Sequence, residues 1–101
     1  METIFQGRCI QWDDKKNELN LKKHGLSLKT ARLVFADKNR LEWLDTEHSE
    51  EEERYKVLGK VGKVILVICT YRGEIVRLIS ARKATAREKE VYYGHSGSVG
   101  L

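Results

Sequence analysis

The stretch of this sequence that most constrains the fold is the apolar run at residues 64–69. The run shows no alternation of apolar and polar residues, a pattern typical of a central strand that is covered on both faces. Turn residues flank it, at 59–62 on one side and 72–73 on the other. Apolar segments lie beyond these turns, at 54–58 and 74–80, so the sequence predicts three consecutive strands joined as an antiparallel meander.

Capping residues mark the ends of the helices. Asp13 or Asp14 offers an N-cap, and Gly25 offers a left-handed residue at the C-terminus of the same helix. Thr85 and Glu88 form a capping box that opens another helix. The predicted elements, in chain order, are a strand at 9–12, a helix that begins after Asp13 or Asp14 and ends at Gly25, a helix at 27–36, strands at 40–44, 54–58, 63–71 and 74–80, and a helix at 84–93.

This order predicts a single α+β domain over residues 1–94, followed by a flexible tail at 95–101. We expect two N-terminal helices and one C-terminal helix to pack on an antiparallel sheet. A sheet with helices on one side can leave its other face open to solvent. Cationic side chains on that open face would form a binding surface.

The distribution of charge points to a polyanionic partner. The chain of 101 residues carries a net charge of +4, although six of its fifteen acidic residues lie within 45–53. The rest of the chain is therefore strongly basic, which suits RNA, DNA or an acidic protein. The cysteines and histidines lack the spacing of metal ligands, and no apolar run approaches the ~20 residues that span a bilayer. We therefore expect a cytoplasmic protein without a metal, a cofactor or a membrane contact.

The candidate phosphate ligands are cations in and around the predicted strands. Arg82 and Lys83 lie between the last strand and the capping box of the last helix, whose free N–H groups also favour anions. Alternation along a strand puts Arg77 and Arg82 on opposite faces unless a bulge intervenes, so we favour Arg82. Further candidates are Arg72 and Arg54, the second of which could instead pair with a neighbouring glutamate.

RNA cleavage without a metal needs a base for the 2′-hydroxyl, cations for the phosphate oxygens and an acid for the departing oxygen. The candidates for proton transfer are His48, Glu53, His24 and the tyrosines. His48 lies in the acidic segment 45–53, where a histidine is more often a solvated residue than a catalyst. Lys22, Lys23 and His24 are explained either as cations at a helix C-terminus or as contacts to RNA.

Several ordered blocks of the sequence resemble the BrnT family of type II toxins. The match covers about 11–92 and includes Trp12-Asp13-x-x-Lys16, Asn20-x-x-Lys23-His24-Gly25, His48-Ser49 with Glu53-Arg54, and Arg77-x-Ile79-Ser80-Ala81-Arg82 with Glu88 and Tyr92. The resemblance implies a RelE-like fold, RNA cleavage without a metal, and inhibition by a BrnA-type antitoxin that also binds operator DNA.

Carried over by position, the resemblance places the site at His48, Glu53, Arg54, Arg77, Arg82 and Tyr92, with Lys23 and His24 as further RNA contacts. Lys83 stands where many relatives have a second arginine, so it keeps the cation but not the forked geometry. We expect Arg82 with Lys83, and then Arg54, to stabilise the phosphate. The sequence thus predicts an endoribonuclease toxin that acts on messenger RNA, free or on the ribosome. Two other interpretations stay open: a non-catalytic basic module that binds nucleic acid or protein, and a DNA-binding subunit that needs a partner.

Overall fold

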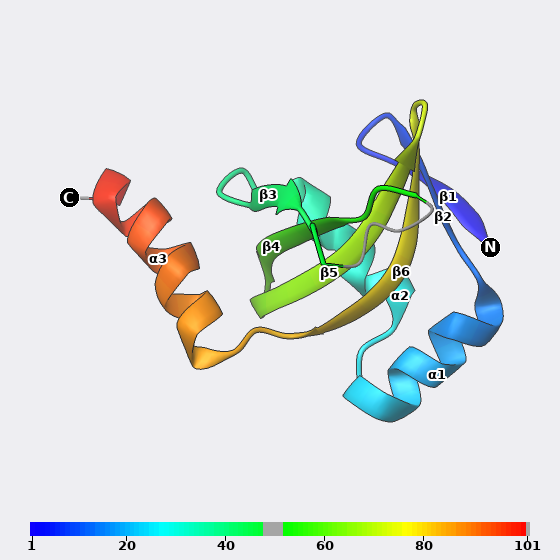
Figure 1. Cartoon of the computed structure of the whole chain (residues 1–101), viewed down its shortest axis with the longest axis horizontal. Coiled ribbons are helices and arrows are strands. Elements are labelled where there is room, and N and C mark those ends of the chain that lie inside the picture. Colours follow the sequence, from blue (N-terminus) through cyan, green and yellow to red (C-terminus); the bar gives the residue numbers. More distant parts are fainter. Residues whose placement is uncertain (48–51, 101) are drawn as a thin grey trace.

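The computed structural model describes residues 1–47 and 52–100. Its described residues form one six-stranded sheet in the order β1-β2-β6-β5-β4-β3. Figure 1 shows this sheet between α1 at one end of the molecule and α3 at the other. The elements are β1 (Glu2–Phe5), β2 (Arg8–Trp12), α1 (Asp14–His24), α2 (Leu28–Ala31), the 3-10 helix η1 (Arg32–Ala36), β3 (Leu41–Leu44), β4 (Tyr55–Val61), β5 (Lys63–Arg72), β6 (Ile75–Lys83) and α3 (Ala86–Gly100).

The predicted meander is confirmed, but the wholly antiparallel sheet is wrong. Strands β3, β4, β5 and β6 pair antiparallel in succession. Strand β2, in contrast, pairs parallel with β6, from Cys9 opposite Ile75 to Trp12 opposite Leu78. Parallel neighbours need a long crossover connection. Here the connection from β2 to β6 contains α1, α2, η1 and the strands β3, β4 and β5. The sheet is therefore mixed.

A strand that the sequence did not predict, β1, forms a hairpin with β2. Its turn residues, Gln6 and Gly7, have φ angles of 55° and 74°, which are the left-handed values that tight hairpin turns require. Asn or Asp usually occupies the first of these positions. The Gln-Gly pair therefore gave no recognisable hairpin signal.

The ends of β4 and β6 lie well beyond the predicted ends at residues 58 and 80. β4 passes through Gly59 to Val61 because this glycine lies directly against η1, where a Cβ atom would come within 2.4 Å of Cγ2 of Val34. β6 continues to Lys83. Arg82 and Lys83 are therefore strand residues and do not form a link between strand and helix.

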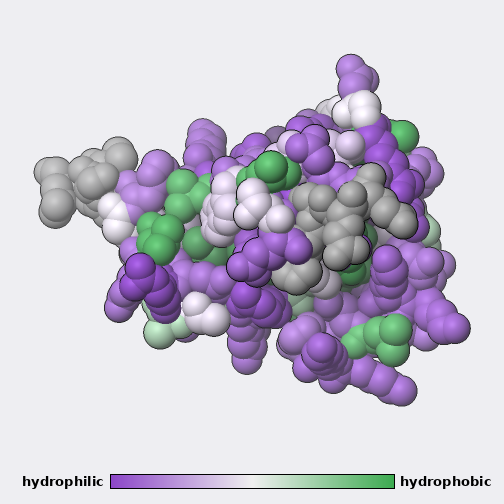
Figure 2. Space-filling view, viewed as in Figure 1, coloured by the Kyte–Doolittle hydropathy of each residue, from purple (hydrophilic) through white to green (hydrophobic). Residues whose placement is uncertain are grey.

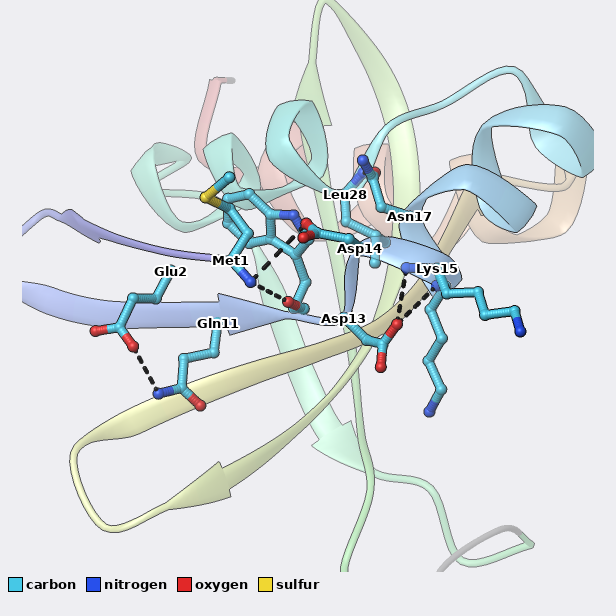
Figure 3. A network of polar contacts seen from close by, with 10 residues as sticks. Met1, Glu2, Gln11, Asp13, Asp14, Lys15, Asn17 and Leu28 are labelled. Atoms are coloured by element: carbon cyan, nitrogen blue, oxygen red, sulfur yellow. Dashed lines mark hydrogen bonds and ion pairs between the residues drawn. The ribbon is translucent and has the colours of Figure 1, made fainter.

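Helix α1 ends at Gly25 as predicted, and its N-cap is Asp13, one of the two predicted candidates. The carboxylate of Asp13 accepts hydrogen bonds from the backbone N–H groups of Lys15 and Lys16, at 2.8 and 3.2 Å, and Figure 3 shows this cap. At the other end, Gly25 has a φ of 66° and its N–H donates to the carbonyl oxygen of Leu21. Both ends follow from residues adjacent in the sequence, which is why the sequence predicts them correctly.

An asparagine, rather than a leucine, holds α1 to the sheet. The side chains of Leu19 and Leu21 are 59% and 51% exposed. Asn20 is buried, its amide donates to the carbonyl oxygen of Ala81 at 2.8 Å, and its oxygen accepts from the N–H of Ala81 at 3.1 Å. The pairing of β2 with β6 ends at Leu78, before Ala81. The side chain of Asn20 therefore forms the hydrogen bonds to the backbone of Ala81 that a neighbouring strand would otherwise form.

The two faces of the sheet are covered differently. Helices α1, α2 and η1 cover one face, and the main core between them and the sheet consists of Ile10, Trp12, Leu26, Leu28, Ala31, Val34, Phe35, Val57, Ile65, Val67, Cys69, Val76, Leu78 and Ala81. Helix α3 covers one end of the other face, where Ala84 and Tyr92 pack on Leu58, Val64 and Leu66. The remainder of that second face carries polar and charged side chains of β4 and β6 together with apolar ones such as Trp43 and Ile68, and we call it the open face.

Helix α3 follows the predicted capping box, but it begins at Ala86 rather than Ala84 and ends later than predicted. Thr85 and Glu88 exchange the hydrogen bonds of a capping box, at 2.8 and 3.1 Å. The helix then continues past Gly94, the predicted end, to Gly100, because a glycine weakens a helix without ending it unless the backbone turns left-handed. Within residues 1–47 and 52–100, no helix is long and apolar enough to cross a lipid bilayer.

Candidate nucleic-acid site

A β-bulge in β6 determines which of its side chains share the open face. Two adjacent residues of β5 pair with Leu78 and Ser80, so Ile79 is an extra residue without a partner on β5. Because of this extra residue, Arg77 and Arg82 lie opposite residues of β5 that point to the same face. The two arginines therefore share the open face, whereas regular alternation would have separated them.

Three cations surround a pocket of about 290 Å³ on the open face. Arg54 precedes β4, Lys56 lies in β4 and Arg82 lies in β6. The other described lining residues are Asp45, Leu66, Ile68 and Ser80. We call this the cation pocket. Three positive side chains and one carboxylate, that of Asp45, line this cavity, and an excess of positive charge is the surrounding that a phosphodiester group requires.

The guanidinium of Arg82 is held in place by the first turn of α3. It donates to both carboxylate oxygens of Glu88, at 2.8 and 3.0 Å, and to the carbonyl oxygen of Lys83 at 3.1 Å. Glu88 also accepts from the N–H of Thr85. The hydrogen bonds from Arg82 are the main reason that the pKa of Glu88 lies below its ordinary value. Glu88 therefore stays ionised and fixes the orientation of Arg82 through a two-point contact.

Lys83 does not join Arg82 in the cation pocket. It pairs with Ile65, whose side chain lies in the main core, so the register directs Lys83 toward the face covered by helices. The structure thus brings Arg82 together with Arg54 and Lys56, and not with its neighbour in the sequence.

Of the acidic segment 45–53, the structure describes residues 45–47 and 52–53, and Asp45 lines the cation pocket. Asp45 is only 4% exposed, and its N–H donates to the carbonyl oxygen of Arg54 at 2.7 Å. The carbonyl oxygen of Glu53 accepts from the hydroxyl of Thr70 at 2.9 Å. The side chain of Glu53 is exposed and is not among the described lining residues of the pocket. His48 lies outside the described residues.

Arg72, at the end of β5, is engaged by Glu52. Its guanidinium donates to both carboxylate oxygens of Glu52, at 2.7 and 3.1 Å, and this contact is the main reason that the pKa of Glu52 is lowered. Arg72 is not among the described residues that line the cation pocket. The pair is exposed, so it contributes little to stability.

Arg77 lines a different pocket, of about 550 Å³, beside the start of α1. Three acids line it as well, Glu2, Asp13 and Asp14, and we call it the acidic pocket. Figure 3 shows Asp13 and Asp14 at the junction of β2 and α1, and Glu2 beside Gln11. The N-cap hydrogen bonds hold the pKa of Asp13 below its ordinary value, and the charge of Arg77 adds to this effect. A phosphate approaching Arg77 would meet these carboxylates, which opposes the predicted RNA contact.

Tyr92 is buried and fastens α3 to the end of η1. Its hydroxyl donates to Oδ2 of Asp37 at 2.5 Å, and Asp37 also accepts from the N–H groups of Lys60 and Asn39 at 2.7 and 2.9 Å. Burial and this contact raise the pKa of Tyr92 well above its usual range. Burial opposes ionisation of Asp37, but its hydrogen bonds outweigh that effect and lower its pKa. Tyr92 is not among the described lining residues of the cation pocket.

Two of the predicted RNA contacts on α1 line a third pocket, of about 310 Å³, which we call the α1 pocket. Lys23 and His24 line it together with Lys16, whereas Lys22 is exposed and is not among its described lining residues. Ser80 belongs to the lining of both the α1 pocket and the cation pocket. The two pockets therefore adjoin.

Sequence reasoning missed Lys56 and Asp45 as members of the site. Lys56 could have been found, because it lies two residues after Arg54 and alternate residues of a strand share a face. Asp45 could not be distinguished from the other acids of its segment by pattern. Among the described residues, no three His, Cys, Asp or Glu side chains lie close enough together to hold a metal ion.

Comparisons with known proteins agree with this architecture. A family model described as the ribonuclease toxin BrnT of type II toxin–antitoxin systems matches residues 12–88. The chain is also similar to the crystal structure of the Brucella abortus ribonuclease toxin BrnT, with a TM-score of 0.59 and 23% sequence identity, over 75% of this chain and 95% of that chain. At this identity the structural match supports the fold alone. No curated protein matches the chain.

Proposed function

The chain belongs to the BrnT family of ribonuclease toxins from type II toxin–antitoxin systems, and from this premise we propose that it is a RelE-like endoribonuclease that cleaves messenger RNA without a metal ion. Membership implies an RNA substrate and an antitoxin partner. We propose further that the partner is a BrnA-type antitoxin, that operator DNA is bound only through that antitoxin, and that the toxin acts in the cytoplasm on free or ribosome-bound messages.

The observation that carries this proposal is the cation pocket. Arg54, Lys56 and Arg82 come from separate parts of the chain and line one cavity on the open face. In the proposed reaction the 2′-oxygen of a ribose forms a bond to the adjacent phosphorus, and the bond from phosphorus to the 5′-oxygen breaks. Negative charge builds up on the phosphate oxygens in between, and cations aimed at that position lower the barrier.

Arg82 is the strongest candidate for this stabilisation, because Glu88 holds its guanidinium at the pocket. Arg54 and Lys56 add charge from the opposite side of the cavity lining. A guanidinium can contact two phosphate oxygens at once, whereas an ammonium acts as a point charge. We therefore assign the main role to the two arginines and a supporting role to Lys56.

The proton-transfer group is proposed to belong to the acidic segment. Glu53 directly precedes Arg54, Asp45 lines the pocket, and His48 lies between them in sequence. The pH dependence of cleavage would distinguish the two kinds of base, because an ordinary carboxyl group loses its proton at a lower pH than an imidazolium. For Tyr92 we propose a positioning role, because its hydroxyl ties α3, and with it Glu88, to Asp37.

The decisive experiment is cleavage of RNA by the purified protein in excess EDTA. The expected products carry a 2′,3′-cyclic phosphate and a 5′-hydroxyl, since the 2′-oxygen is the proposed nucleophile. Arg54→Ala should slow cleavage about 10²-fold or more, as loss of one charge-stabilising donor does, whereas Arg87→Ala, an exposed change on α3, should not. Cleavage that EDTA abolishes would refute metal independence, and a protein that only shifts the mobility of RNA would be a binding module.

A further inference from the structure

The α1 pocket and the cation pocket adjoin at Ser80, and we propose that they form one groove for single-stranded RNA. The scissile phosphate lies in the cation pocket and a neighbouring nucleotide lies in the α1 pocket. This inference rests on the proposed ribonuclease function and deepens it, because it assigns a path and a strandedness to the substrate.

One face of α1 forms a wall of this groove. The residues of α1 that line the pocket are spaced three and four apart, which places them on a single helical face; they are Lys16, Leu19, Asn20, Lys23 and His24. The two hydrogen bonds between Asn20 and Ala81 fix this face beside β6. The cations of α1 therefore stand at a fixed place next to the cation pocket, with no carboxylate among the described lining residues.

The bulge supplies the opposite wall. Ile79, the residue without a partner on β5, lines the α1 pocket. Leu19 faces the same cavity and is 59% exposed. Two apolar side chains between lysines offer a surface for the flat face of a base, while the lysines reach the phosphates on either side of it.

The acidic pocket makes it unfavourable for the RNA strand to run from the cation pocket toward Arg77 instead of toward α1. A strand that left the cation pocket toward Arg77 would pass Glu2, Asp13 and Asp14, which repel phosphates. The α1 pocket is lined by Lys16 and Lys23 instead. A duplex keeps its bases stacked inside, so it cannot place one base in a cavity of about 310 Å³. The groove therefore selects a single strand.

The test compares two matched pairs of exposed lysines. Lys16→Ala/Lys23→Ala changes the α1 pocket, and Lys15→Ala/Lys29→Ala removes the same charge outside it. The affinity of each protein for a short single-stranded 2′-O-methyl oligonucleotide, which cannot supply the nucleophile, is measured by fluorescence anisotropy at several salt concentrations. We expect the first pair to bind more weakly and to lose about 1.4 from the slope of log K against log salt, at about 0.7 per phosphate contact. The variant Lys15→Ala/Lys29→Ala should have the affinity and the salt slope of the unmodified protein.

Leu19→Ala separates the apolar contact from the charge. This exposed change should weaken binding of the single strand without altering the salt slope, because no phosphate contact is lost. Melting temperatures identify any variant that fails to fold. Equal losses for the two lysine pairs, no loss for Lys16→Ala/Lys23→Ala, or equally tight binding of a duplex would each overturn the groove.

Cleavage is measured separately, so the two proposals can fail independently. If the protein binds RNA through the groove but never cleaves it, the proposed ribonuclease function is wrong and the proposed groove stands. A protein that cleaves RNA with the same efficiency when Lys16 and Lys23 are alanine, and whose salt slope does not change, refutes the groove alone.

Discussion

The cation pocket and the acidic pocket lie on the same face of one sheet, and each contains an arginine from β6. Arg82 shares its pocket with Arg54 and Lys56, whereas Arg77 shares its pocket with Glu2, Asp13 and Asp14. The strand presents both guanidinium groups in the same direction. The neighbours that other elements contribute, and not the strand itself, decide which arginine can receive a phosphate.

The second difference between the pockets is what holds each arginine. Two hydrogen bonds from Arg82 to Glu88 connect the guanidinium to the start of α3, and Tyr92 connects α3 to Asp37. Arg77 instead contributes to the low pKa of Asp13 at the start of α1. The guanidinium of Arg82 is fixed beside the cation pocket, whereas the charge of Arg77 acts on the carboxylate that caps α1.

The largest expected effect is the contrast between alanine variants of the two arginines. Arg82→Ala should lower the rate of RNA cleavage by about 10²–10³-fold, because the transition state loses an oriented cation. Arg77→Ala should change it by less than about tenfold, since its surroundings repel phosphate. Single-turnover cleavage of one RNA measures both, with circular dichroism as the control for folding. Equal losses would show that the charge of the surrounding acids does not matter.

Substitution of Asn20 tests how much its side-chain hydrogen bonds to the backbone of Ala81 in β6 stabilise the protein. Asn20→Ala leaves the N–H and C=O of Ala81 without their hydrogen bonds, which should cost about 1–3 kcal/mol of unfolding free energy. Urea denaturation gives this value, and Asn39→Ala, an exposed change, serves as the control. RNA affinity should fall with Asn20→Ala, because the wall of the α1 pocket is no longer fixed. Unchanged stability and affinity would contradict the role given to this side chain.

A smaller effect is expected from Glu88→Gln, which keeps the shape of the cap but removes the charge that orients Arg82. Cleavage should slow about tenfold, the equivalent of about 1.4 kcal/mol in barrier height. Glu90→Gln, on an exposed position of the same helix, is the matched control. Faster cleavage after Glu88→Gln would mean that the carboxylate competes with the substrate for Arg82.

The smallest effect concerns pH. The folded-state pKa values of Asp37 and Glu88 lie below their ordinary values, so the stability that they provide is present above the unfolded values, at about pH 4, and is lost as the pH falls through the folded values. The melting temperature should therefore drop on acidification below about pH 4. Asp37→Asn should flatten this drop, as should Tyr92→Phe, which removes a hydrogen bond that favours the ionised carboxylate. Identical acid profiles in all three proteins would rule out this linkage.

Features that depend on adjacent residues could be predicted from the sequence. The caps of α1 at Asp13 and Gly25, the capping box of Thr85 and Glu88, and the meander around the apolar run at 64–69 are of this kind. The parallel contact of β2 with β6 was missed, because it joins segments at opposite ends of the chain. No local pattern specifies which strand will lie beside another over such a distance.

The candidate site likewise contains residues that the sequence predicts and neighbours that it does not. Arg54 and Arg82 were predicted as phosphate ligands, and the structure places both in one pocket. The position of Arg77 among carboxylates could not be predicted, because Glu2 comes from the unrecognised strand β1. Tyr92 was predicted by resemblance, but its partner Asp37 comes from the end of η1, 55 residues earlier.

The bulge at Ile79 makes β6 tolerant of a change that strands rarely accept. If this residue were excised, Leu78 and Ser80 would become consecutive, and they already pair with consecutive residues of β5. Every remaining side chain would keep its side of the sheet, whereas excision elsewhere in a strand inverts all residues on one side of the cut. Ile79 is thus dispensable for the ladder, and a shortened chain would keep its hydrogen-bonded frame while losing one wall of the α1 pocket.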